Sequence, residues 1–244
     1  MIVSWFSAGV SSFIATYIEK ESIDKIVYTH IDDQHEDTLR FLGDCENVLE
    51  KKIDVLQSKY RSVNSVIRQF RFINSPYGAK CTDILKRRPR KEWEYKHRAK
   101  DLTYIWGYDW GEKHRADRLV EAMPDFSHKF PLIERQLTKE EAHGILRELG
   151  IRRPKMYDMG YQNNNCIGCV KGGMGYWNKI RVDFPEVFAE RARLERKIGA
   201  SCIRGVYLDE LDPERGRFED EILDECNIVC QLALHEMGDN HDKN

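Results

Sequence analysis

The sequence predicts an α/β fold in which helices flank a parallel β-sheet, followed by a C-terminal extension rich in cysteine and glycine. Three observations support this prediction. Short apolar runs that suit strands buried on both faces alternate with segments of helical period over residues 1–106. The chain has 244 residues, enough to bury a complete core. Its 33% charged residues and mean hydropathy of -0.63 are typical of a soluble protein.

The predicted elements follow one another in a regular order. We expect strands at residues 1–7, 26–31, 53–56 and 102–106, and helices at residues 13–19, 38–50 and 63–70. This β-α-β-α-β succession is typical of a parallel sheet. Ligands of such sheets bind beyond the carboxyl ends of the strands.

The character of the sequence changes after Pro131. Thr138 is expected to cap a helix with Glu141 as its capping-box partner, and Leu149-Gly150 to end it. A charged amphipathic helix is expected at about 186–198. The acidic tail, 209–244, is expected to fray at its end.

Charge and cysteine content narrow the classes of function. The net charge of -2 excludes a globally basic nucleic-acid binder, though not a local basic patch. No apolar run approaches a membrane span and no secretory signal is recognisable, so we expect a cytoplasmic protein without membrane contact. Seven cysteines without an export signal favour metal binding, redox chemistry or buried thiols over structural disulfides.

The segment from Ser7 to Ser12 joins the first predicted strand to the first predicted helix. A strand, a turn of serine and glycine, and a helix N-terminus gather backbone N–H groups around one point, where the helix dipole also favours an anion. Serine hydroxyls add donors, which favours phosphate. The spacing is not that of a Walker A loop. The alternative is an ordinary β-to-α turn with a serine N-cap.

The most informative stretch is 166–177, in which Cys166 and Cys169 have C-x-x-C spacing. Three asparagines precede it, and a lysine and several glycines follow, a composition that we do not expect in a packed core. The spacing lets both sulfurs bind one metal or cluster, or form a redox pair. Further cysteines available as ligands are Cys81, Cys202, Cys226 and Cys230.

Ser7-x-Gly9-x-x-Ser12 resembles the PP-loop, S-G-G-x-D-S, of N-type ATP pyrophosphatases and phosphoadenosine phosphosulfate (PAPS) reductases. Later segments that resemble the family's motifs, in the same order, are 78–86, 107–115, 131–133 and 157–161. Together they are most similar to a PAPS-reductase-like branch found in phages and mobile elements. The resemblance implies a Rossmann-like (HUP-type) sheet. It also implies an adenine-nucleotide-binding domain at 1–135, with a helical, cysteine-bearing segment at 136–244 packed on it.

Two positions depart from the PP-loop pattern. The second glycine of the family is Ala8 here, and the backbone can keep its shape if φ of this alanine is negative. The aspartate of the family is Ser11, which puts in doubt any step that needs a carboxylate to orient magnesium or pyrophosphate.

The resemblance implies site residues for ATP or PAPS with Mg2+. The nucleotide would contact Ser7, Ala8, Gly9, Val10, Ser11, Ser12, His30, Asp32 and Gly107. Substrate phosphate or sulfate would contact Lys86, Arg87, Arg115, Arg118 and Lys171. The catalytic candidates are Ser12, Arg115 and Cys226. Plainer alternatives are a solvated strand end at His30 and Asp32, a solvated helix face at 86–91, and a surface ion pair between Glu112 and Arg115.

Three interpretations of the cysteines follow from the residues and the resemblance. Cys81, Cys166 and Cys169, with Cys230 or Cys226, would bind a [4Fe–4S] cluster, as related sulfur-handling proteins do. Four cysteines would otherwise hold a structural Zn2+. In the third interpretation, Glu225-Cys226-Asn227 resembles the Glu-Cys-Gly tail of PAPS reductases, whose cysteine is the nucleophile. Cys45 and Cys202 are expected to be buried spectators.

The leading hypothesis is an ATP pyrophosphatase that adenylates a substrate for sulfur or nitrogen transfer. Alternatives are a PAPS or adenosine phosphosulfate (APS) reductase that uses a thioredoxin-like reductant, and a nucleotide-binding module without turnover. The acceptor of the sulfur or nitrogen can be tRNA, DNA or a small metabolite. The sequence also leaves open the identity of the sulfur donor and whether the protein forms a homodimer.

Overall fold

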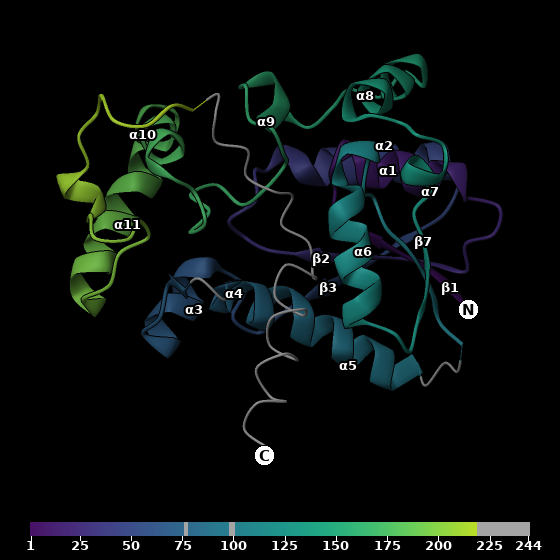
Figure 1. Ribbon diagram of the computed structural model, residues 1–244, viewed down its shortest axis with the longest axis horizontal. Helices are drawn as coiled ribbons and strands as arrows, with labels where there is room; N and C mark the ends of the chain where they lie inside the picture. Colours follow the sequence, from purple (N-terminus) through teal and green to yellow (C-terminus); the bar gives the residue numbers. More distant parts are fainter. Residues whose placement is uncertain (76–77, 98–100, 219–244) are drawn as a thin grey trace.

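The computed structural model describes residues 1–75, 78–97 and 101–218 of the chain (Figure 1). Within these residues a sheet of five strands has the order β3-β2-β1-β6-β7. The strands are β1 (Ile2–Phe6), β2 (Lys25–His30), β3 (Ile53–Gln57), β6 (Thr103–Ile105) and β7 (Ser127–Lys129). Every neighbouring pair in this sheet is parallel, which confirms the predicted α/β fold.

Helices cover both faces of the sheet (Figure 1). One face is covered by α1 (Val10–Ile18), α2 (Asp37–Leu49), α7 (Pro131–Glu134) and α8 (Lys139–Glu148), and the other by α5 (Arg88–His97) and α6 (Lys113–Ala122). Side chains of the central strand β1 alternate between the two faces. Trp5 packs with Trp93 of α5, whereas Phe6 belongs to the same cluster as Phe13 of α1. Both faces of β1 are therefore buried, as predicted.

A third apolar cluster joins the remaining helices to the chain beyond the end of β2. Its helices are α3 (Val63–Phe70), α4 (Lys80–Thr82), the π-helical turn η1 (Asp83–Arg87), α10 (Met174–Asp183) and α11 (Pro185–Ile198). Trp177 of α10 is completely buried in this cluster. The smaller elements are β4 (Asn74–Ser75), β5 (Gly78–Ala79), η2 (Trp110–Glu112), α9 (Lys155–Asp158) and η3 (Leu208–Glu210). The C-x-x-C segment thus lies in a packed cluster of its own.

Most elements lie where the sequence predicts them. The Thr138 Oγ1 accepts a hydrogen bond from the N–H of Glu141, whose carboxylate accepts one from the N–H of Thr138, so the capping box is confirmed. The serine N-cap that belonged to the alternative interpretation of the first loop is wrong, because Gly9 is the N-cap and no side chain caps this helix. α10 begins inside the glycine-rich stretch, where the sequence gives no helical signal. No helix in the described part of the chain is long and apolar enough to span a bilayer.

Candidate functional site

The loop between β1 and α1 is held in shape by its own serines. The backbone N–H of Ser7 donates to Ser12 Oγ at 2.9 Å, and that of Gly9 donates to Ser7 Oγ at 3.3 Å. The next N–H, of Val10, donates to the Tyr157 hydroxyl at 3.3 Å. The N–H groups of Ser11 and Ser12 donate to no acceptor in the described residues, although both residues are buried. Two adjacent N–H groups at the start of α1 are thus left for an anion.

Ala8 occupies the left-handed region of backbone conformation, with φ at +62°. The condition of a negative φ is therefore not met, and the alanine keeps the backbone shape that a glycine would have. A left-handed conformation costs an L-residue roughly 1–2 kcal/mol. The methyl group is completely buried in the cluster that includes Val10 and Phe13. Burial of this methyl group offsets part of the strain.

The asparagines before the C-x-x-C turn are buried, so the expectation that this stretch makes poor core is wrong. Asn164 Nδ2 donates to the carbonyl oxygen of Ala8 at 2.9 Å and to Thr38 Oγ1 at 3.1 Å. Asn163 Oδ1 accepts a hydrogen bond from Lys139 Nζ at 2.5 Å. The backbone N–H of Ile167 donates to the Asp33 carbonyl oxygen at 2.8 Å. These hydrogen bonds offset the free-energy cost of burying the amide groups. They also connect the segment to the loops after β1 and β2.

Gly107, which follows β6, lies directly against the loop. A Cβ atom at this position would stand 2.3 Å from Ser12 Cα and 2.6 Å from Ser12 N. Only glycine fits so close to another backbone. Gly107 is therefore brought to the predicted nucleotide site, where it fixes the start of α1.

Arg115 lies on α6 near the same end of the sheet and is almost completely buried. Its guanidinium forms an ion pair with Glu112 and lies 5.0 Å from the centre of the Tyr108 ring. The ion pair expected as the plainer alternative is therefore present, but it is not on the surface. Arg118 is exposed and donates to the carbonyl oxygen of His114 in its own helix. The substrate role of both arginines stays a prediction.

At the end of β2, the predicted nucleotide contacts His30 and Asp32 already have protein partners. The Asp32 carboxylate accepts from Arg61 Nε at 2.9 Å and from Gln57 Nε2 at 2.8 Å. His30 Nδ1 lies 3.3 Å from the Tyr28 hydroxyl, which donates to Gln34 Oε1 at 2.5 Å. Burial raises the pKa of Tyr28, so this hydroxyl stays protonated as a donor. A nucleotide here would meet a preformed polar network.

Cys81, Cys166 and Cys169 line one cavity of about 20 Å3, together with Lys86 and Lys171. The structure thus brings together residues that the sequence assigned to a metal and to phosphate. The cavity is scarcely larger than a water molecule. No group of three or more His, Cys, Asp or Glu side chains among the described residues is placed to hold a metal ion. The ligand set expected from the sequence also includes Cys230 or Cys226, which lie outside the described residues, so a metal or cluster at these cysteines stays a prediction.

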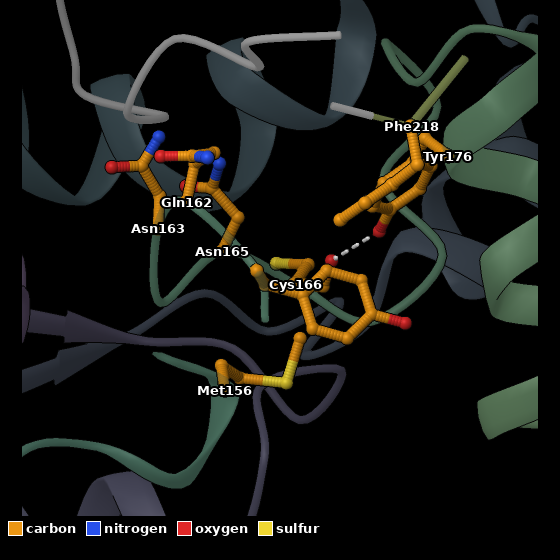
Figure 2. A pocket seen from close by; sticks show the side chains of 8 residues that line it. Met156, Gln162, Asn163, Asn165, Cys166, Tyr176 and Phe218 are labelled. Atoms are coloured by element: carbon orange, nitrogen blue, oxygen red, sulfur yellow. Dashed lines mark hydrogen bonds between the residues drawn. The ribbon is translucent and has the colours of Figure 1, made fainter. Parts of the chain in front are cut away.

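A tyrosine hydroxyl organises the C-x-x-C turn. Tyr176 Oη donates to the carbonyl oxygen of Cys166 at 3.2 Å and accepts from the N–H of Cys169 at 2.9 Å. Gly168 between the cysteines has φ at +70°, which suits glycine. Figure 2 shows Tyr176 and Cys166 on the wall of a small cavity that Met156, Asn163 and Phe218 also line. The sequence gives no sign that Tyr176 has this role, because its partners are backbone groups.

The remaining predicted residues have mixed placements. Arg87 pairs with Asp83 at 2.9 Å, so its charge is partly used within η1. Arg90 is buried, 3.5 Å from the Glu94 carboxylate, which contradicts a fully solvated face for this cationic run. Cys45 and Cys202 are buried, as predicted, and burial raises the pKa of both thiols. Cys226 and Cys230 lie outside the described residues.

Comparison with known proteins gives a limited result. No model of a known protein family matches the chain, and no curated protein matches it. A solved structure of a phosphoadenylyl-sulfate (PAPS) reductase from Candida auris, a phosphate complex, is similar with a TM-score of 0.46 and 10% sequence identity. The similarity covers 66% of this chain and 78% of that chain. The function has to be argued from the residues of the site.

Proposed function

We propose that the protein is a PAPS-reductase-like enzyme of the PP-loop group that binds an adenine nucleotide at the loop from Ser7 to Ser12. The observation that carries the proposal is that the N–H groups of two buried residues at the start of α1, Ser11 and Ser12, have no acceptor among the described residues. They lie at the carboxyl end of the central strand, where parallel sheets bind ligands. Asn164 and Gly107 fix the loop from two sides.

The favoured reaction is attack on the α-phosphate of ATP, which releases pyrophosphate and leaves an adenylated substrate. The N–H groups of Ser11 and Ser12 would bind the negative charge of the leaving pyrophosphate. Arg115 would add a positive charge, held in place by Glu112 and the Tyr108 ring. Bound Mg2+ would supply further charge neutralisation. Because Ser11 replaces a carboxylate, the ion would be held by the phosphates more than by the loop.

The adenylated substrate would then accept sulfur or nitrogen, with AMP as the leaving group. A thiolate of the cavity at Cys81, Cys166 and Cys169, favoured by Lys86 and Lys171 beside it, would take the outer sulfur of a persulfide donor, whose own thiol leaves. The resulting cysteine persulfide would displace AMP from the substrate. A second thiol of the cavity would then release the thiolated substrate by forming a disulfide, which an external thiol reductant would reduce. Iron or zinc at these cysteines is a separate hypothesis, tested by metal analysis of protein purified without oxygen. It also needs Cys226 or Cys230, which lie outside the described residues.

A binding module without turnover is the second candidate, and Ser11 is the observation that favours it. Binding of ATP and PAPS should be measured by calorimetry, and release of pyrophosphate and of sulfite by product assays. Binding with pyrophosphate release supports the proposal, whereas sulfite release with PAPS supports a reductase that uses Cys226. Binding without either product supports the module. If the wild-type protein binds neither ATP nor PAPS, the proposal is refuted.

A further inference from the structure

A larger cavity, of about 450 Å3, lies beside α8 on the side of the molecule where α8 and α9 are seen together (Figure 1). Its volume is in the range of sites for small molecules. The lining residues are Lys139, Glu140, His143, Arg147, Arg153, Tyr157, Gly160, Tyr161 and Gln162. None of these is among the residues predicted to bind the nucleotide.

The lining of this α8 cavity is predominantly cationic. Lys139, Arg147 and Arg153 contribute three positive charges, and Glu140 contributes one negative charge. Arg153 Nε is 2.7 Å from the Asp158 carboxylate, which neutralises part of its charge. The guanidinium of Arg147 forms no hydrogen bond or ion pair with the described residues, and it is exposed. A cavity with this balance favours an anionic ligand.

His143 gives an independent sign of a ligand site. Its Nδ1 is buried and has no hydrogen-bond partner within the described part of the chain. The ring is edge-on to Tyr157, with 4.7 Å between centroids. Burial, followed by the charges of Arg153, Lys139 and Arg147, lowers the pKa of His143 to about 4. An anion in the cavity would offset those charges and provide an acceptor for the imidazole.

The cavity is connected to the candidate site through shared residues. Tyr157 lines it and accepts the hydrogen bond from the N–H of Val10 in the loop. Tyr161 and Gln162 line both this cavity and the smaller one in which Cys166 lies. Gln162 and Cys166 are labelled in Figure 2. A ligand beside α8 would therefore lie next to both the loop and the cysteines.

We propose that the α8 cavity is a second anion site, which binds the phosphate group of a small phosphorylated molecule through Arg147, Lys139 and His143. The single acidic residue in the lining and the exposed, unengaged Arg147 favour a monoester dianion over a neutral ligand. The volume of about 450 Å3 suits a molecule of nucleotide size or smaller better than a nucleic-acid strand, which needs an extended groove. The inference does not depend on nucleotide binding at the loop.

The test is titration of the protein with ribose 5-phosphate and with inorganic phosphate, followed by NMR of the histidine side chains. His143→Gln identifies the His143 signal. We expect saturating ligand to raise the pKa of His143 from about 4 toward the ordinary value of 6.5. We expect Arg147→Ala to weaken binding about tenfold, since charge-assisted hydrogen bonds to phosphate are strong. Arg193→Ala, at an exposed arginine of α11, should leave binding unchanged.

Comparison of the two ligands distinguishes a small phosphorylated molecule from free phosphate as the source of the bound group. Tighter binding of ribose 5-phosphate than of inorganic phosphate supports a small organic ligand, and equal binding supports a site for free phosphate. An unshifted His143 signal, or equal losses in Arg147→Ala and Arg193→Ala, would overturn the proposal. Binding of a single-stranded oligonucleotide that Arg147→Ala weakens, without binding of ribose 5-phosphate, would also overturn it.

Discussion

Asn164 Nδ2 donates to the carbonyl oxygen of Ala8 at 2.9 Å, which joins residues 156 positions apart. The same amide donates to Thr38 Oγ1, so one side chain connects the loop after β1 to the start of α2. This relationship makes the shape of the loop from Ser7 to Ser12 depend on the segment before the C-x-x-C turn. The first prediction tests that dependence.

Asn164→Ala removes the donor and leaves the buried Ala8 carbonyl without it. We expect a loss of about 1–3 kcal/mol in the free energy of unfolding, measured by urea titration. Nucleotide affinity, measured by calorimetry, should fall as well because the loop loses its anchor. Asn178→Ala is the matched control, since Asn178 Nδ2 donates to the carbonyls of Asp212 and Arg215, away from the loop. It should destabilise the protein and leave affinity unchanged; equal affinity in both variants would contradict the prediction.

Gly107→Ala places a methyl group inside the backbone of Ser12. Overpacking of this kind costs about 1–3 kcal/mol or more, and the start of α1 must shift to relieve it. We expect a lower melting temperature and loss of nucleotide binding. Gly43→Ala is the control, because Gly43 lies within α2 and a Cβ there has no neighbour within 4 Å. That variant should gain about 0.5–1 kcal/mol. Normal nucleotide binding by Gly107→Ala would exclude the loop as the phosphate site.

Substitutions at Ala8 test its left-handed backbone. In Ala8→Gly, relief of strain is opposed by loss of a buried methyl group and by greater freedom of the unfolded chain, so we expect a change within about 1 kcal/mol. Ala8→Val adds bulk and a β-branched side chain at positive φ, and should cost at least about 2 kcal/mol. Thermal unfolding of the two variants provides the comparison. A valine variant as stable as the wild type would mean that φ at this position is not positive.

The pKa of His143, lowered to about 4, predicts a dependence of stability on pH. In the unfolded chain His143 takes up a proton near the ordinary pKa of 6.5, whereas in the folded protein it takes up the proton only near pH 4. Stability from this residue is thus complete above pH 6.5 and is lost as the pH falls toward 4. Urea unfolding at pH 7 and pH 5 should show a larger loss for the wild type than for His143→Gln. Equal losses would show that His143 is not shielded.

The cysteines should differ in reactivity. Cys45 and Cys202 are buried and their thiol pKa values are raised, whereas Cys81 is partly exposed. Because the thiolate is the reactive form, we expect iodoacetamide to modify Cys81 well before Cys45 and Cys202 in the folded protein. Peptide mass spectrometry of samples taken over time measures the order. Modification of Cys45 first would place it outside the core.

Local patterns predict the sheet and much of its helical cover. The apolar runs of β1 and β2 and the pairing of Thr138 with Glu141 are signals contained in a few neighbouring residues. The loop after β1 is also recognisable, because its serines and Gly9 lie together. Local patterns do not show which distant residues will form hydrogen bonds with a buried polar side chain. The burial of Asn164 depends on Ala8 and Thr38, and that of Arg90 on Met123 as well as Glu94.

The bond from Asn164 to Ala8 also has a consequence for the order in which the molecule can be completed. β1 and α1 are synthesised well before Asn164 and Ile167, which anchor the loops after β1 and β2. A nascent chain that already has its central strands would still lack the anchor of the loop from Ser7 to Ser12. Competence to bind the nucleotide should therefore arise late in synthesis, when the cysteine segment reaches the sheet.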